Sequence, residues 1–143
     1  MQLFPSNRTP EYLLKYAEFA MRYLGLDKLR GDINLYVVPE VKDCHGICYG
    51  DARECDIFIA NKLFGESVSR EDKMKTLGHE LTHARQFLRR DLGEDVKEGE
   101  AMWLGKPYKY SPGYEDDSPW ELEAVKYENL IWDSWKLMHG KYK

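Results

Sequence analysis

The chain has 143 residues, of which 43% are hydrophobic and 13% aromatic, and its formal net charge is −4 at pH 7. This composition is typical of a folded globular protein rather than a disordered chain, and the length suits one compact domain over residues 1–143. The slight excess of acidic residues, 25 against 21 basic ones, argues against a dedicated nucleic-acid binder, which normally carries a strong basic excess.

The sequence contains no apolar run of about 18 residues, so we expect no transmembrane helix. Its N-terminal stretch lacks the basic segment, the apolar core and the cleavage site of a secretory signal. The three cysteines, Cys44, Cys48 and Cys55, are an odd set and a poor disulfide framework for a secreted domain. If the chain starts at Met1, we expect a cytoplasmic protein with reduced, partly buried thiols.

The first predicted element is an amphipathic helix over residues 10–26, PEYLLKYAEFAMRYLGL. Its apolar residues recur at spacings of three and four, which places them on one face of a helix. Thr9 is a suitable N-cap, with Pro10 in the first helical position, and Gly25 is typical of a helix end.

Three strands are predicted next, at INLYVVP (33–39), GICYGD (46–51) and CDIFIA (55–60). All three are rich in residues that favour strands, and GDARE (50–54) contains the expected hairpin turn between the last two. Both faces of CDIFIA carry apolar side chains, so we expect the flanking helices to cover the sheet. We predict a small, three-stranded and mostly antiparallel sheet.

A second helix is predicted over residues 70–90, because Ser69 precedes acidic residues and the helical period of apolar residues continues beyond them. Residues 91–118 are polar and rich in Gly, Pro and Tyr, which predicts a long irregular loop with a short extended piece at AMWLG.

The last helix begins with Ser118 as N-cap and Pro119 in the first position, and an apolar stripe continues through Met138. The predicted fold class is therefore α+β, in the order helix, three strands, helix, long loop and helix.

The second predicted helix contains GHELTHARQ. His79 and His83 lie about 40° apart around the helix axis, so both can direct an imidazole nitrogen at one metal ion. Glu80 is offset by roughly 100° from His79 and is better placed to take a proton from a metal-activated water than to bind the metal. The alternative is that the motif occurs by chance, on a helix whose histidines are solvated or lie in the core. Leu77 and Leu81 favour the metal site, because they would bury the motif within a helix.

A hydrolytic zinc site needs a third protein ligand and an open position. His139 is expected to be exposed near the end of the chain, and His45 lies in a turn region, so a carboxylate is the better candidate. Glu121 and Glu123 occupy the first turns of the last helix, about 200° apart, so only one can point at the ion. Glu121 also occupies the N3 position of a capping box that starts at Ser118. Periodicity alone leaves both glutamates open.

GHELTHARQ followed by PWELEA resembles the gluzincin zinc metallopeptidases in their minimal single-domain form, and is similar to short proteins of phage and bacterial genomes. The resemblance implies a zincin-like fold and zinc-dependent cleavage of a protein or peptide substrate. It implies His79, His83 and Glu121 as the zinc ligands, with Glu121 preferred to Glu123. It also implies Glu80 as the catalytic base.

One position departs from the family pattern. Many gluzincins carry Asp or Asn four residues after the ligand glutamate, where this chain has Val125. Another acid, such as Asp56 or Glu128, would then have to support one of the histidines.

The resemblance also implies that the substrate adds as a strand to an edge of the sheet, for which CDIFIA is the expected partner. Candidates for stabilising an oxyanion are His45, Tyr108, Tyr110 and Tyr114.

Two other functions stay open: a zinc-fold binding or scaffold protein with little turnover, and a metallo-hydrolase of a non-peptide bond. Glu80 favours an enzyme, because a purely structural site needs no base. The natural substrate and the oligomeric state are not predicted.

Overall fold

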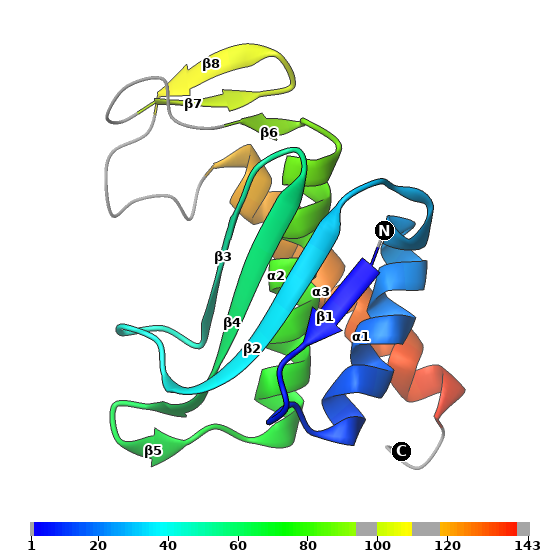
Figure 1. Cartoon of the computed structure of the whole chain (residues 1–143), viewed down its shortest axis with the longest axis vertical. Helices are drawn as coiled ribbons and strands as arrows, with labels where there is room; N and C mark the ends of the chain where they lie inside the picture. Colours follow the sequence, from blue (N-terminus) through cyan, green and yellow to red (C-terminus); the bar gives the residue numbers. More distant parts are fainter. Residues whose placement is uncertain (1, 94–99, 110–117, 140–143) are drawn as a thin grey trace.

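The structure is a computed structural model that describes residues 2–93, 100–109 and 118–139 (Figure 1). These residues form a mixed α+β fold with three α-helices and two sheets. The helices are α1 (Glu11–Leu24), α2 (Arg70–Leu88) and α3 (Pro119–Met138), and a 3-10 turn (Leu26–Lys28) follows α1. The larger sheet contains β1 (Gln2–Pro5), β2 (Asp32–Glu40), β3 (Gly46–Gly50), β4 (Glu54–Leu63) and β5 (Glu66–Ser67). The smaller sheet contains β6 (Leu92–Gly93), β7 (Glu100–Trp103) and β8 (Lys106–Lys109).

The larger sheet has the order β1-β2-β4-β3, and β5 also pairs with β4. β1 pairs with β2 in parallel, β2 pairs with β4 in parallel, and β3 is antiparallel to β4. The prediction of a three-stranded, mostly antiparallel sheet is therefore wrong. The helix α1 connects β1 to β2 and returns the chain to the same end of the sheet, which makes their pairing parallel. β1 was missed because QLFP is short, ends in proline and shows little alternation.

The predicted hairpin between β3 and β4 is confirmed. Its turn is held by Asp51, whose Oδ1 accepts hydrogen bonds from the amides of Arg53 and Glu54 at 2.8 and 3.0 Å. β4 continues past the hairpin to pair with β2 on its other side, so β4 is a central strand and β3 lies at the edge.

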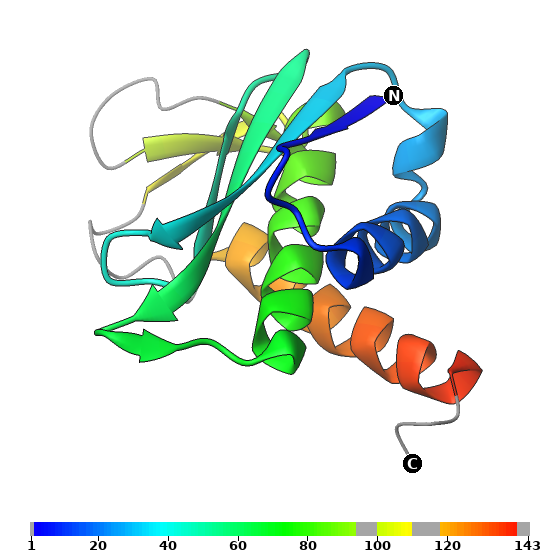
Figure 2. The ribbon, with the colours of Figure 1, turned by 60° about the horizontal axis from the view of Figure 1, so that its bottom comes forward.

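All three helices lie on one face of the larger sheet (Figure 2). Side chains of β2 and β4 that point toward the helices form the core with them, and Ile33, Leu35, Ile57 and Ile59 are fully buried. Among the described residues, the expectation that helices cover the sheet holds for this face alone. On the other face, Phe58 stacks with Tyr36 at a ring distance of 4.9 Å, and Tyr36 is exposed.

The helix ends follow the expected capping chemistry. Ser69 accepts a hydrogen bond from the amide of Asp72 at 3.1 Å and caps α2. Gly25 ends α1 with a φ of 73°, a left-handed conformation that favours glycine. Pro10 is the N-cap of α1, one residue later than predicted, and α2 ends at Leu88 rather than at residue 90.

The segment predicted as a long loop contains a small antiparallel sheet, β6-β7-β8, and the extended piece expected at AMWLG is β7. Leu92 of β6 and Ala101 of β7 pack with Trp120 of α3, so this sheet lies against the C-terminal end of α2 and the start of α3. The rest of the segment, 94–99 and 110–117, lies outside the described residues.

Cys44 and Cys48 are half-buried, as predicted, whereas Cys55 is fully buried, and all three are free thiols. Among the described residues, no helix combines the length and the apolar character needed to cross a membrane.

Gly46 allows β3 to approach α2 closely. A Cβ atom at this position would lie 2.7 Å from Thr76 Cγ2 and 2.9 Å from the backbone oxygen of Phe58. We therefore expect Gly46→Ala to lower the free energy of unfolding by ~1–3 kcal/mol through overpacking, measured by urea denaturation. Gly78→Ala is the control, because a Cβ there meets only ordinary contacts at 3.7 Å or more. Equal urea midpoints for wild type and Gly46→Ala would contradict the close approach.

Candidate metal centre

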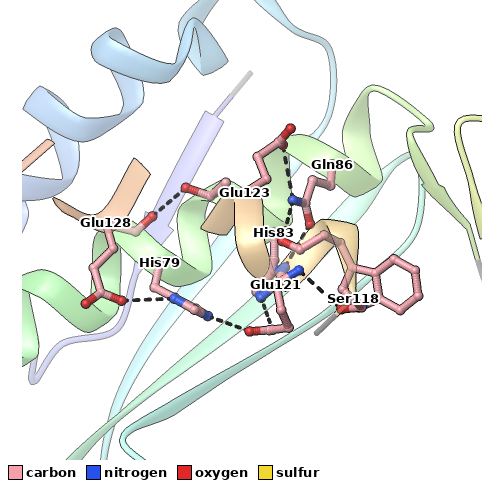
Figure 3. Close-up of polar contacts among 10 residues, drawn as sticks. His79, His83, Gln86, Ser118, Glu121, Glu123 and Glu128 are labelled. Carbon is pink, nitrogen blue, oxygen red and sulfur yellow. Dashed lines mark hydrogen bonds and ion pairs between the residues drawn. The ribbon is translucent and has the colours of Figure 1, made fainter. Parts of the chain in front are cut away.

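The helix α2 presents His79 and His83 from one face, with ring centroids 5.0 Å apart. The helix is fixed by its packing: Leu77, Leu81 and Ala84 are fully buried in the core. The two imidazoles lie on the side of α2 that meets the first turn of α3 (Figure 3). The i, i+4 spacing therefore places both rings together, as the sequence predicts.

Glu121 of α3 brings its carboxylate between the two rings (Figure 3). Its Oε2 lies 3.2 Å from His79 Nε2, and its Oε1 lies 2.7 Å from His83 Nε2. One ligand atom from each of these three residues lies within 4.8 Å of the others. We call His79, His83 and Glu121 the metal triad, because this spacing is small enough for one metal ion to contact all three.

The structure distinguishes the two glutamates that the sequence left open. The Glu121 amide donates to Ser118 Oγ at 3.3 Å, so its backbone takes part in the cap while its carboxylate lies against the histidines. Glu123 points elsewhere, with its Oε1 3.1 Å from Gln86 Nε2 and 3.6 Å from an Arg85 nitrogen. Of the two, Glu121 is the one that meets the histidines.

The outer nitrogen of each histidine has its own partner. His79 Nδ1 lies 3.0 Å from Glu128 Oε1, and His83 Nδ1 lies 2.8 Å from Gln86 Oε1. Gln86 is fully buried, and its Nε2 donates to the backbone oxygen of Trp120 at 3.0 Å and to Glu123. Because that amide nitrogen can only donate, Gln86 Oε1 accepts from His83 Nδ1–H, which leaves Nε2 as the atom that could bind a metal.

The sequence analysis named Glu128 as one possible support and missed Gln86. Glu128 lies seven residues, or two helical turns, after Glu121 and therefore on the same side of α3. Gln86 lies three residues after His83 on α2, a spacing that indicates a shared face. Val125 is 46% exposed and, as an apolar residue, offers no hydrogen-bond acceptor to either histidine. The other candidate, Asp56, accepts a hydrogen bond from Asn34 at 2.9 Å and supports neither histidine.

Glu80 is only 7% exposed and lies where two cavities meet. Burial raises the pKa of this carboxyl group, although His83 and His79 partly lower it. One cavity, of about 370 Å³, extends from the triad along β3 to Phe87, Leu92 and Trp120.

The second cavity, of about 210 Å³, is lined by Glu80 and His79 together with His45, Thr76 and Glu128. The triad therefore lies in a cleft with an aromatic and aliphatic side and a more polar side. Both sides share Gly46, at the start of the edge strand β3.

The strand beside the cleft differs from the one predicted. CDIFIA belongs to β4, which pairs with β2 and β3 and has no free edge along that stretch. β3 is the edge strand that lines the larger cavity, because the hairpin places it outside β4.

The remaining sequence candidates lie in different places. His45 is exposed and lines the smaller cavity. His139 is half-buried rather than exposed, because its ring stacks on Trp135 at 3.6 Å. Tyr108 packs edge-on against Trp120 at 5.2 Å. Tyr110 and Tyr114 lie outside the described residues.

Comparison of the sequence with models of known protein families gives no match, and comparison with curated proteins gives none either. Function is therefore inferred from the geometry and chemistry of the cleft.

Gln86 is expected to hold His83 ready for metal. Gln86→Ala removes the acceptor of His83 Nδ1 and two hydrogen bonds to α3, so we expect divalent-metal affinity to fall about 10- to 100-fold. The measurement is competition of Zn²⁺ and Co²⁺ against a chromophoric chelator. Asn129→Ala, which removes an exposed amide on α3, is the control and should keep wild-type affinity. Unchanged affinity in Gln86→Ala would show that His83 needs no such support.

The metal-free triad should make stability depend on pH. Burial lowers the pKa of His79, but hydrogen bonds to Glu121 and Glu128 outweigh it and raise the pKa from 6.5 to about 10. Burial raises the pKa of Glu121, but the two histidines outweigh it and lower the pKa from 4.5 to about 2. The stabilisation from His79 is complete below pH 6.5 and is lost as the pH rises toward 10, whereas that from Glu121 is complete above pH 4.5 and is lost toward pH 2.

Urea denaturation of wild type and Glu121→Gln in a chelator, across this pH range, measures the effect. The stability difference between them should be largest between pH 4.5 and 6.5 and shrink on both sides. The pKa values of Glu80 and His83 are also raised. The stability of the variant is therefore compared with that of the wild type at each pH. A difference that is constant with pH would rule out the carboxylate–imidazole interaction.

Proposed function

We propose that the protein is a zinc-dependent metallopeptidase. His79, His83 and Glu121 would hold the zinc ion, and Glu80 would act as the catalytic base. The observation that carries the proposal is the position of Glu80, a buried carboxylate that lines both cavities of the cleft.

The donor set of the triad suits zinc. Two imidazole nitrogens and one carboxylate are a common protein ligand set of catalytic zinc sites, which keep a further position open. The outer nitrogens of both histidines are held by Glu128 and Gln86, as is usual for metal-binding histidines. When bound, zinc supplies a Lewis acid that polarises a substrate carbonyl and lowers the pKa of water.

Glu80 supplies the proton chemistry. Burial raises the pKa of its carboxyl group, which makes the ionised form a stronger base near neutral pH. Its carboxylate would take a proton from the attacking water and pass it to the leaving amine. A buried carboxylate that lines a cleft favours an enzyme over a scaffold, because burial of such a group is costly and perturbed carboxyl groups gather at functional sites.

A peptide suits the shape of the cleft. The edge strand β3 runs along the larger cavity, and among the described strands only β4 pairs with it. An extended peptide can add to such an edge through backbone hydrogen bonds. Phe87, Leu92 and Trp120 offer an apolar wall to its side chains. The resemblance of GHELTHARQ and PWELEA to gluzincins supports the same substrate class.

Glu80→Gln tests the proposal. We expect this variant to keep one zinc ion per chain and to lose cleavage of an unfolded protein substrate by about 10²- to 10⁴-fold, because the amide cannot accept the proton. Metal content is measured by elemental analysis and cleavage by mass spectrometry of the products. Glu71→Gln, at an exposed position of the same helix, is the control and should remain fully active.

Three results would contradict the proposal. A well-folded wild type that takes up no zinc would exclude the metal site. Zinc binding without cleavage of any peptide would favour the scaffold alternative. Turnover of esters or other non-peptide bonds, with peptides left intact, would assign a different hydrolase activity.

A further inference from the structure

The outward face of α3 carries a stripe of five residues at spacings of four, four, three and four: Leu122, Lys126, Leu130, Asp133 and Leu137. All five are exposed, and the leucines are 60%, 38% and 83% accessible. The stripe extends for about 22 Å along the helix at 1.5 Å per residue. Such spacing places the five side chains along one line that another helix can contact.

The opposite face of α3 already has its partners. Trp120, Ala124, Ile131 and Trp135 are buried against the rest of the fold. The helix lies at the edge of the helical layer (Figure 2), so the stripe points away from the sheet. The three leucines do not belong to the core of their own chain, and the apolar surface that each exposes to water would be stabilised by burial against a partner.

The order of the stripe is symmetric. Read from either end it gives leucine, a charge, leucine, a charge and leucine, and the two charges have opposite sign. In an antiparallel pair of identical helices, Leu122 lies opposite Leu137 and Lys126 opposite Asp133, while Leu130 lies near the two-fold axis. A parallel pair would instead place like charges side by side, which is unfavourable.

We propose that the stripe is an interface at which α3 pairs antiparallel with α3 of a second copy of the chain. The contact is isologous, because the same five residues serve both partners. The interface contains two Lys126–Asp133 pairs, and each lies beside leucine contacts. Asp133 also lies 3.6 Å from Lys136 of its own chain, and this exposed contact is weak enough to be shared.

The interface leaves the cleft accessible. Glu121 lies about 100° around the helix axis from Leu122 and faces the histidines of α2. One helix from each partner makes a small interface, so the dimer forms in a concentration-dependent equilibrium. The inference does not depend on the proposed enzymatic activity.

Charge reversal tests the pairing. Lys126→Asp places two acids opposite each other at both ends of the interface, and Asp133→Lys does the same with two bases. Each variant should weaken the dimer about tenfold or more, measured by sedimentation velocity over a range of concentrations. An equimolar mixture of the two variants restores opposite charges at both ends and should dimerise as the wild type does. The double variant should do so as well.

Lys15→Asp on α1, where Lys15 is an exposed partner of Glu11, is the control and should dimerise as the wild type does. Circular dichroism of every variant checks that it is folded. A wild type that stays monomeric at millimolar concentration would overturn the proposal. A dimer that survives both single reversals would overturn it too, because its interface would then lie elsewhere, such as the aromatic outer face of the sheet.

Discussion

The close approach of a carboxylate to two imidazoles connects the helices α2 and α3. Glu121 lies 3.2 and 2.7 Å from the two Nε2 atoms, in a region where an uncompensated charge would be costly. The geometry of the rest of the site follows from this contact. The rings must face α3, and their outer nitrogens need separate partners, Glu128 on α3 and Gln86 on α2. Glu80 is left lining the cavities.

The first turn of α3 begins the helix with a cap and also connects it to α2. Ser118 caps the helix and fixes where the turn starts, which sets the direction of Glu121. The backbone oxygen of Trp120 accepts a hydrogen bond from Gln86, so the same turn is tied to α2 next to Glu121. A capping serine is therefore compatible with a candidate ligand glutamate three residues later, because the cap uses the backbone amide and leaves the carboxylate to the histidines.

Helical periodicity predicted that His79 and His83 share a face, because that depends on spacing within a single helix. Glu121 was expected only through the resemblance to gluzincins. The choice between Glu121 and Glu123 needed the rotation of α3 against α2, which no single-helix pattern contains. The parallel pairing of β2 with β4 was missed for a similar reason. The hairpin turn is local and was found, whereas the neighbour on the other side of β4 depends on the path of the whole chain. Gln86 went unrecognised because glutamine is ordinary on a helix until its partners are known.

The small sheet β6-β7-β8 shares its packing with the cleft. Leu92 and Trp120 belong to the cluster that holds this sheet against the helices, and both also line the larger cavity. The packing that holds the small sheet against the helices therefore also holds this wall of the cavity in place. Among the described residues these strands have few buried neighbours, and such strands open more often than a core does. Thermal fluctuation of the small sheet would therefore change the width of the cavity while the triad between α2 and α3 stays intact.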